Sequence, residues 1–193
     1  MTVLFIEGPD GCGKTEIAKR LAQDLTLPYF KVSTEAENWK NNTFKESLKF
    51  DAFLPQFMKQ TGVSFISDRG YASEWVYSKV FDRETDALLL KQIDSEWTEL
   101  GATHIILLRK DYTNSRFDEL VPQEKLQDLH DTYLEFINNF TGTDCIGIYV
   151  DEFKVGNGYD LEAQVKEIYA GLEAFRVKRR YPRVYDLIRK GEV

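Results

Sequence analysis

Eight residues near the N-terminus have the types and spacing of a phosphate-binding loop. Residues 8–15 read GPDGCGKT and fit the pattern G-x-x-x-x-G-K-[ST] at every fixed position. Glycines let the backbone turn so that several N–H groups point at phosphate oxygens, and the N-terminus of a following helix also favours an anion. The residues predicted to bind a nucleotide are Gly8, Asp10, Gly11, Cys12, Gly13, Lys14 and Thr15.

Two side chains of this loop carry predicted roles in phosphoryl transfer. Lys14 is placed to bridge the β- and γ-phosphates of ATP. The hydroxyl of Thr15 is placed to bind Mg²⁺, so ATP and Mg²⁺ are the expected cofactors. The context that such a loop requires is also present, because an apolar run at 3–6 precedes it and helical spacing over 15–25 follows it.

Strands and helices alternate along the whole chain. Short apolar runs predict further strands at 29–32, 63–67, 104–108 and 145–150. Helical spacing predicts helices at 44–59 (interrupted by Pro55), 73–80, 86–99, 123–139 and 160–176. This alternation is typical of an α/β protein. With the phosphate-binding loop, it predicts a three-layer P-loop NTPase fold in which a five-stranded parallel sheet carries helices on both faces. We treat 1–193 as one domain.

Composition excludes several classes of protein. The 193 residues carry a formal net charge of −7, which argues against general nucleic-acid binding. Two cysteines, Cys12 and Cys145, cannot make a disulfide framework and have no metal-binding spacing. The apolar start is too short for a signal peptide and no membrane-length segment occurs, so we expect a cytoplasmic protein. His104 is expected in a strand core and His130 on a helix surface.

Two blocks of residues, the phosphate loop with its flanks and a second block at 68–77, together resemble a known family. Residues 5–15, FIEGPDGCGKT, are similar to the opening F-E-G-x-D-G-x-G-K-T of thymidylate kinases. Residues 68–77, DRGYASEWVY, resemble the family's D-R-[YH]-x-x-S-x-x-A-Y and match it at Asp68, Arg69, Ser73 and Tyr77. The resemblance runs from residue 1 to about residue 150. The chain thus resembles the thymidylate kinase-like P-loop (deoxy)nucleoside monophosphate kinases.

The resemblance implies roles for the matching residues. Asp10 would accept a hydrogen bond from the 3′-hydroxyl of the acceptor, and Arg69 would grip the acceptor phosphate. Asp68 would help to hold Mg²⁺ or orient Arg69, while Ser73 and Tyr77 would line the acceptor pocket. The other interpretation of Asp68 and Arg69 is a surface ion pair at a strand end. A small-molecule nucleotide substrate, a role in nucleotide biosynthesis and a possible homodimer are further implications.

The later part of the chain offers a lid and a basic tail. Residues 109–122 partly resemble the family's arginine-bearing lid, R-x-x-x-R-x-x-D-x-x-E. Arg116 is the candidate catalytic arginine, with Arg109 and Lys110 as supports. Solvated charges are the alternative. The basic tail at 176–193 is interpreted as solvated or as packing against another subunit. Nucleic-acid contact is the alternative, because Tyr181 and Tyr185 interleave with its cations.

Aromatic residues between the second and third strands could bind a base. Trp39, Phe44, Phe53 and Phe57 lie where the family builds its base pocket, and Phe44 is our candidate for substrate binding. Each of them, taken singly, is more often part of a core.

One departure from the family leaves the acceptor open. Thymidylate kinases carry R-E-P-G-G-T after the second strand, whereas residues 31–39 here read KVSTEAENW. The leading prediction is a kinase acting on dTMP or a related monophosphate. The alternative is a deoxynucleoside kinase with Glu35 or Glu37 as general base. More remote options are a P-loop NTPase switch and a kinase acting on DNA or on a modified nucleotide.

Overall fold

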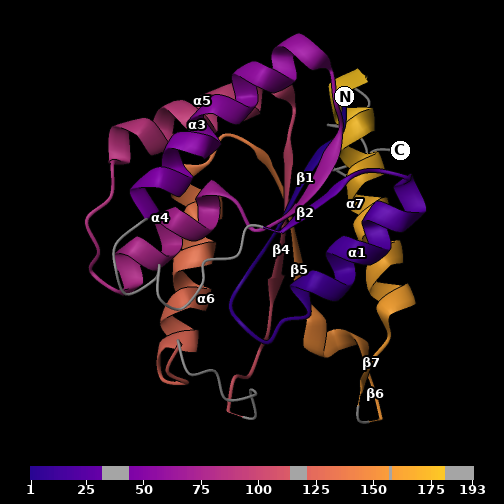
Figure 1. Ribbon diagram of the computed structural model, residues 1–193. Helices are drawn as coiled ribbons and strands as arrows, with labels where there is room; N and C mark the ends of the chain where they lie inside the picture. The colour runs from indigo at the N-terminus through magenta and orange to yellow at the C-terminus, as the bar shows by residue number, and fades with distance from the viewer. Residues whose placement is uncertain (32–43, 114–120, 157, 181–193) are drawn as a thin grey trace.

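A parallel sheet of five strands lies at the centre of the molecule (Figure 1). We describe residues 1–31, 44–113, 121–156 and 158–180 of a computed structural model. The strands follow the spatial order β2-β3-β1-β4-β5. Their bounds are Val3–Glu7 for β1, Tyr29–Lys31 for β2, Phe65–Asp68 for β3, Thr103–Leu108 for β4 and Asp144–Tyr149 for β5. The five predicted strands and their parallel arrangement are confirmed.

The three inner strands, β3, β1 and β4, are buried along their whole length. The longer two, β1 and β4, are nearly continuous apolar runs, as expected of parallel strands covered on both faces. Their register pairs Leu4 with Thr103, and on the other side β1 pairs Val3 with Phe65 of β3. The carboxyl ends of β1 and β3 therefore stand side by side, and residues following these two strands are brought together.

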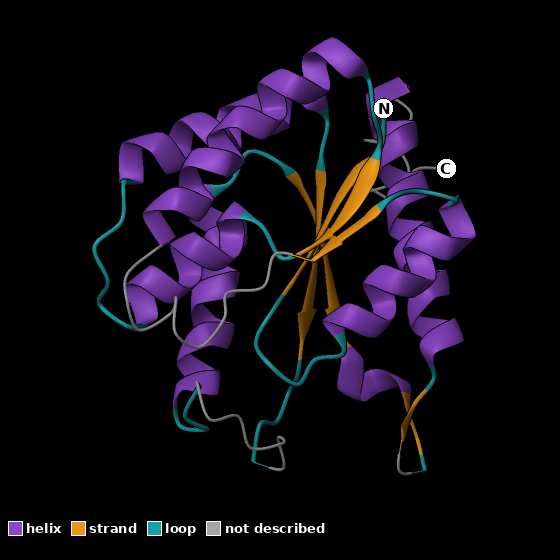
Figure 2. Ribbon diagram, viewed as in Figure 1, coloured by secondary structure: helices purple, strands orange, loops and turns teal. Residues whose placement is uncertain are grey.

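Helices cover both faces of the sheet, as Figure 2 shows. Helices α1 and α7 lie on one face and contact each other, while α3, α4, α5 and α6 lie on the other (Figure 1). Their bounds are Lys14–Leu25 for α1, Phe44–Thr61 for α3, Tyr71–Val80 for α4, Ala87–Leu100 for α5, Lys125–Glu135 for α6 and Leu161–Arg180 for α7. The predicted three-layer architecture is therefore confirmed. In the part of the chain described, no helix is long and apolar enough to cross a bilayer.

Local details differ from the sequence predictions in four places. Pro55 lies inside α3 without ending it, because the helix packs along α5 and tertiary contacts offset the lost backbone bond. The helix predicted over 123–139 begins at Lys125 and changes at Phe136 into a π-helical turn, η1 (Phe136–Phe140). A 3₁₀ turn, η2 (Val150–Phe153), and a two-stranded hairpin, β6 (Lys154–Val155) with β7 (Gly158–Tyr159), follow β5 and were not predicted.

His130 was wrongly predicted to lie on a helix surface. It is buried between the rings of Tyr112 and Tyr149, and its Nδ1 lies 3.3 Å from the Tyr112 hydroxyl. Burial lowers the pKa of His130. The loop that follows β4 covers this face of α6, and helical spacing alone does not reveal such a cover. His104 lies in the strand core as predicted.

Candidate functional site

The predicted phosphate loop connects the end of β1 to the start of α1, and its glycines are required by geometry. Gly8 has φ of 133°, and a Cβ atom there would lie 2.1 Å from the carbonyl oxygen of Leu107 on β4. Gly13 precedes α1 in the left-handed conformation, with φ of 75°. Both positions exclude ordinary side chains, so the loop can wrap closely with its N–H groups turned inward.

Lys14 is held inside this loop. Only 7% of the residue is exposed, and its Nζ donates a hydrogen bond of 2.7 Å to the carbonyl of Pro9. The same Nζ lies 3.5 Å from Oδ1 of Asp10. Burial, followed by the charge of Arg69, lowers the pKa of Lys14. A cation fixed among backbone N–H groups is suited to bind an anion with several oxygens, such as a polyphosphate.

Thr15 and Asp68 come together as a pair of oxygen donors. The Thr15 hydroxyl donates to Oδ2 of Asp68 at 2.6 Å, and the Tyr29 hydroxyl donates to the same oxygen at 3.1 Å. A hydroxyl and a carboxylate suit Mg²⁺, which usually takes one or two protein oxygens and fills the remaining positions with phosphates and water. The described residues contain no cluster of three or more His, Cys, Asp or Glu able to hold a metal. Asp68 contacts Thr15 and Tyr29 rather than Arg69.

The four other residues matched in the sequence also meet. The Arg69 guanidinium pairs with Oδ1 of Asp10 and donates to the Ser73 hydroxyl at 3.1 Å. It lies 5.1 Å from the ring centroid of Tyr77, whose hydroxyl donates to Oδ2 of Asp10 at 2.7 Å. Burial acts to raise the pKa of Asp10, but the charges of Arg69 and Lys14 outweigh it and the pKa is lowered. Asp10 therefore stays ionised and bridges two cations.

Arg69 holds an unusual backbone conformation. Its φ is 77°, in the left-handed region that non-glycine residues rarely occupy. The Ser67 hydroxyl donates to the Arg69 carbonyl at 2.6 Å, and the Arg69 N–H donates to Ile6 at 2.9 Å. A Cβ on the next residue, Gly70, would lie 2.6 Å from the Phe5 ring. These contacts hold the strained turn in place, and in this conformation the guanidinium contacts Asp10 of the phosphate loop.

Glu7 belongs to this site although the sequence assigned it no role. It ends β1 with none of its surface exposed, and its Oε2 accepts hydrogen bonds from Ser73 at 2.6 Å and Tyr133 at 3.2 Å. Its other oxygen, Oε1, has no hydrogen-bond partner among the residues that the structure describes. Burial raises the pKa of Glu7 to about 7, although Ser73, Arg69 and Lys14 oppose the rise. The one signal in the sequence was a carboxylate that ends an apolar strand.

Three other predicted residues lie beyond this cluster or are inert in it. Arg109 follows β4 and pairs with Asp151 at 3.2 Å, while Lys110 pairs with Glu152 at 2.8 Å. Both cations are therefore tied to the segment after β5. Cys12 is buried in the phosphate loop, and burial raises the pKa of its thiol to about 11, so the thiol is neutral.

Several predictions fall on residues that the structure does not describe. Arg116, Glu35, Glu37, Trp39 and the tail from 181 onward are outside the described residues. Phe44 begins α3, but its side chain is also outside the description. Phe53 and Phe57 are described and are 59% and 42% exposed, so neither is a core residue.

The site thus has two halves that share one carboxylate. The phosphate loop with Lys14 and the Thr15–Asp68 pair form an anion and cation site after β1. Arg69, Ser73 and Tyr77 form a second anion site after β3. Asp10 contacts both Lys14 and Arg69, so two bound phosphate groups would lie close to each other. Such a pair of sites can move a phosphoryl group from one to the other.

Comparisons with known proteins agree with this architecture. No family model matches the chain, and no curated protein matches it. Among solved structures, YorR from Bacillus subtilis in complex with phosphorylated GDP is similar, with a TM-score of 0.64 and 20% identity over 93% of this chain and 98% of that chain. Deoxyadenosine kinase from M. mycoides with bound dATP has a TM-score of 0.59 and 20% identity over 90% and 100% of the two chains. Thymidylate kinase from Ehrlichia chaffeensis has a TM-score of 0.57 and 18% identity over 89% and 98%. This chain therefore has the P-loop fold that the deoxyadenosine kinase and the thymidylate kinase share.

Proposed function

We propose that this protein is an ATP-dependent kinase that phosphorylates a deoxynucleoside monophosphate, dTMP or a related nucleotide. The observation that carries the proposal is the bridge made by Asp10, which contacts Lys14 of the donor half and Arg69 of the acceptor half. The two halves are thereby adjacent, and transfer between two phosphates requires that donor and acceptor lie close together. The likeness in fold to a thymidylate kinase and a deoxyadenosine kinase supports the same class of reaction.

In the proposed reaction an oxygen of the acceptor phosphate attacks the γ-phosphorus of ATP. The bond between that phosphorus and the β–γ bridging oxygen breaks, and ADP leaves with the bond's electron pair. Loop N–H groups and Lys14 hold the donor phosphates, while Arg69 holds the acceptor phosphate. Arg116 of the predicted lid would add charge over the transferring group. Thr15 and Asp68 would hold Mg²⁺, which neutralises charge between the donor phosphates when bound.

A deoxynucleoside kinase is the second candidate function. The deoxyadenosine kinase with bound dATP shares this fold over 90% of the chain. In that case Glu35 or Glu37 would take the proton of a 5′-hydroxyl. The contacts of Arg69 favour a monophosphate acceptor over a nucleoside. Its guanidinium pairs with the carboxylate of Asp10 rather than with Asp68, so it lies in the site in a position to bind an anionic group such as a phosphate.

The proposal is tested by ADP release with Mg-ATP and a panel of deoxynucleoside monophosphates and deoxynucleosides. Lys14→Ala should lower kcat by about 10²–10³-fold, because one fixed donor to the transition state is lost. Lys19→Ala removes an exposed lysine of the same helix and should leave kcat unchanged. Arg69→Ala should raise KM for the acceptor more than KM for ATP.

Each outcome separates the candidates. Turnover on a monophosphate supports the proposal, whereas turnover on nucleosides alone moves the function to the second candidate. Full activity of Lys14→Ala, or no turnover on either set, contradicts the kinase proposal.

The setting we propose is the cytoplasm, with a small-molecule nucleotide as substrate. The two cysteines, Cys12 and Cys145, are free thiols in the structure, as a reducing compartment would keep them. A homodimer remains part of the proposal. It is tested by sedimentation of the purified protein at several concentrations.

A further inference from the structure

Glu7 is a buried carboxylate next to the strained turn of the acceptor half. It ends β1 with none of its surface exposed, and its Oε2 accepts hydrogen bonds from Ser73 at 2.6 Å and Tyr133 at 3.2 Å. Its Oε1 has no hydrogen bond within the described residues and lies against the turn after Arg69, because a Cβ on Gly70 would be 3.5 Å from it. A buried carboxylate that is only half satisfied costs stability, so a fold that retains one needs another reason for it.

Ser73 links this carboxylate to the guanidinium of Arg69. Its Oγ donates to Oε2 of Glu7 at 2.6 Å and accepts a hydrogen bond of 3.1 Å from Nη1 of Arg69. A hydroxyl has one proton to donate and two lone pairs with which to accept. Because an ionised carboxylate can only accept, the proton of Ser73 points to Glu7 and a lone pair is left for Arg69. The direction of this one hydroxyl therefore depends on Glu7.

Tyr133 completes the cluster without taking over the role of Glu7. Its hydroxyl lies 3.1 Å from Oγ of Ser73 and 3.2 Å from Oε2 of Glu7, and its single proton can serve only one of them. The contact between Ser73 and Glu7 is the shorter one, and a charged acceptor makes the stronger hydrogen bond. The carboxylate thus decides which way Ser73 donates.

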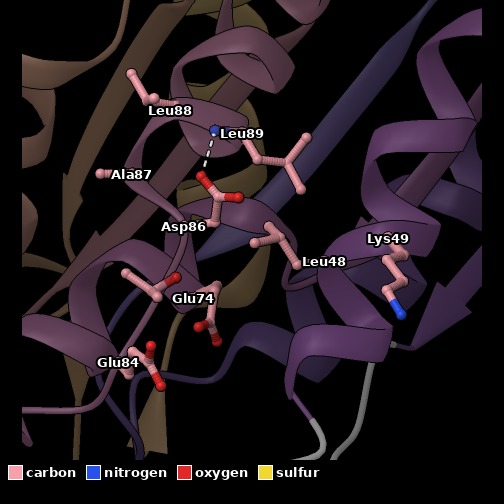
Figure 3. A pocket seen from close by; sticks show the side chains of 9 residues that line it. Leu48, Lys49, Glu74, Glu84, Asp86, Ala87, Leu88 and Leu89 are labelled. Carbon is pink, nitrogen blue, oxygen red and sulfur yellow. Dashed lines mark hydrogen bonds between the residues drawn. The ribbon is translucent and has the colours of Figure 1, made fainter.

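The residue after Ser73 lies on another side of α4. Glu74 lines a cavity of about 450 Å³ between α3, α4 and the first turn of α5 (Figure 3). The charged residues of the described lining are Lys49, Glu74, Glu84 and Asp86. Three carboxylates against one lysine would repel a phosphate, whereas Arg69 on the Ser73 side attracts one. The acceptor phosphate is therefore expected on the side that Ser73 serves, a step that rests on the proposed function.

We propose that Glu7 is a positioning residue for the acceptor phosphate. Through Oε2 it directs the proton of Ser73, so that the oxygen of Ser73 accepts from Arg69 and fixes one end of the guanidinium. Asp10 fixes the other end. Arg69 is thereby held in one conformation before the acceptor arrives, and its remaining N–H groups are left for phosphate oxygens. A side chain that is already ordered loses less entropy on binding, so the acceptor binds more tightly.

The test compares substitutions of Glu7 that differ in whether they can accept a hydrogen bond. Glu7→Met keeps the length of the side chain without an oxygen. It should raise KM for a deoxynucleoside monophosphate about tenfold, which corresponds to about 1.4 kcal/mol, and leave KM for ATP within about twofold. Glu7→Gln retains an oxygen for Ser73 and should keep both KM values within about twofold. Glu7→Leu gives the same readout as Glu7→Met if that variant does not fold, and an unchanged KM for ATP shows that a variant is folded.

A control and the choice of pH separate positioning from stability. Asp94→Asn alters a buried carboxylate that accepts from Tyr71 and not from Ser73, so it should lower stability and leave both KM values unchanged. The assay is run at pH 8, because burial raises the pKa of Glu7 to about 7 and the carboxylate must be ionised. The charges that interact with Glu7 are those of Lys14 and Arg69 and of Asp51, a buried carboxylate of α3; all variants are compared at this one pH.

A double substitution shows whether Glu7 acts through Ser73. Ser73→Ala removes the acceptor of Arg69 and should itself raise KM for the monophosphate about tenfold. Adding Glu7→Met to Ser73→Ala should raise it no further, because the path from Glu7 to Arg69 is already broken. If the two effects add in full, Glu7 does not position Arg69 by way of Ser73 and the inference is overturned.

Equilibrium binding separates this inference from the proposed function. Affinities for dTMP, dCMP, dAMP and dGMP, measured by isothermal titration calorimetry with Mg-ADP present, should follow the same order of variants as KM. A wild type that binds a monophosphate without transferring phosphate contradicts the proposed function, and the affinities then decide the inference. Turnover with equal acceptor affinity in the wild type and Glu7→Met overturns the inference and leaves the kinase intact. A wild type that binds none of the four overturns both.

Discussion

Two buried networks of polar side chains begin on the first turn of α4 and differ in how completely they are bonded. The core network joins Tyr71, Asp94, His104, Thr141 and Thr143 between α4, α5, β4 and the turn before β5. The site network joins Ser73, Glu7, Tyr133, Arg69 and Asp10 at the carboxyl ends of β1 and β3. The two networks start two residues apart in the sequence and point to different ends of the sheet.

The core network satisfies its carboxylate completely. Oδ1 of Asp94 accepts hydrogen bonds from the hydroxyls of Tyr71, at 2.8 Å, and Thr141, while Oδ2 accepts the backbone N–H of Gly142 at 3.0 Å. His104 lies 2.9 Å from the Tyr71 hydroxyl and is neutral, since burial lowers its pKa to about 3. Both oxygens of this carboxylate are used inside the protein, so it ties elements together and leaves no acceptor for a ligand. Within the described residues, Nδ1 of His104 is the atom of this network that is buried without a hydrogen bond.

The site network leaves an acceptor unused at the same depth. Oε1 of Glu7 has no hydrogen bond within the described residues. The network also holds a strained arginine whose guanidinium is 22% exposed. A closed network specifies the fold, whereas an open one keeps groups for a ligand and lowers the stability of the ligand-free protein. The predictions below test this contrast.

The largest effect on stability is expected from breaking the core network. Asp94→Ala removes, at a residue only 5% exposed, the carboxylate that accepts from the Tyr71 and Thr141 hydroxyls and the Gly142 N–H and that ties α5 to α4 and to the turn before β5. The free energy of unfolding should fall by about 3–5 kcal/mol, measured by urea denaturation. Asp128→Ala removes an exposed carboxylate of α6 and should change it by less than about 0.5 kcal/mol. If both variants unfold at the same urea concentration, the core network does not tie the fold together.

A pH-dependent effect is expected from the open network. The pKa of Glu7 is about 7 in the folded protein against an ordinary value of 4.5, so the folded state holds a proton that the unfolded state has lost between these values. Stability should therefore fall as pH rises from about 5 to 8, and Glu7 alone should contribute about 2–3 kcal/mol of that fall. Arg69 and Lys14 face Glu7 and limit the fall, whereas Asp51 adds to it.

Glu7→Gln removes this titration and should flatten the profile of melting temperature against pH. Glu167→Gln, an exposed substitution on α7, should follow the wild type. A Glu7→Gln profile as steep as that of the wild type would show that Glu7 is ionised throughout this pH range. The carboxylate of the site network would then be as well stabilised as that of the core network.

The sequence predicted the sheet and the phosphate loop better than it predicted the site network. The five strands were visible as apolar runs, and the phosphate loop as fixed residues whose spacing is demanded by backbone geometry at Gly8 and Gly13. The resemblance assigned Asp10 and Arg69 separate roles toward the acceptor without predicting their contact, and the order of the parallel strands brings them together. Both kinds of signal are local or follow from topology.

The site network and the burial of α3 residues depend on contacts between residues far apart in sequence. Tyr133 reaches Glu7 across 126 positions, and no pattern around either residue announces the contact. The depth of Asp51 depends on how α3 rotates against its neighbours, which helical spacing with exposed Phe50 and Phe53 on the same helix does not settle. Side chains that serve a ligand rather than the core break the apolar periodicity on which such predictions rest.

The smallest effect is expected from a single hydroxyl of the open network. Tyr133→Phe keeps a fully buried ring but removes the oxygen that lies 3.1 Å from the Ser73 hydroxyl and 3.2 Å from Glu7. Stability should fall by about 1 kcal/mol, because one buried hydrogen bond is lost. Since Ser73 also accepts from Arg69, KM for the acceptor should rise a few-fold while KM for ATP stays constant.

A purely structural role for this hydroxyl would lower stability without splitting the two KM values. The loss of the Tyr133 hydrogen bond should also raise the pKa of Glu7 further, because that bond favours its ionised form. The pH at which the melting temperature levels off should therefore move upward. Tyr149→Phe, at a tyrosine whose hydroxyl makes no hydrogen bond within the described residues, should shift neither the KM values nor the profile. An equal response of the two variants would mean that the Tyr133 hydroxyl fills space and does not position Arg69.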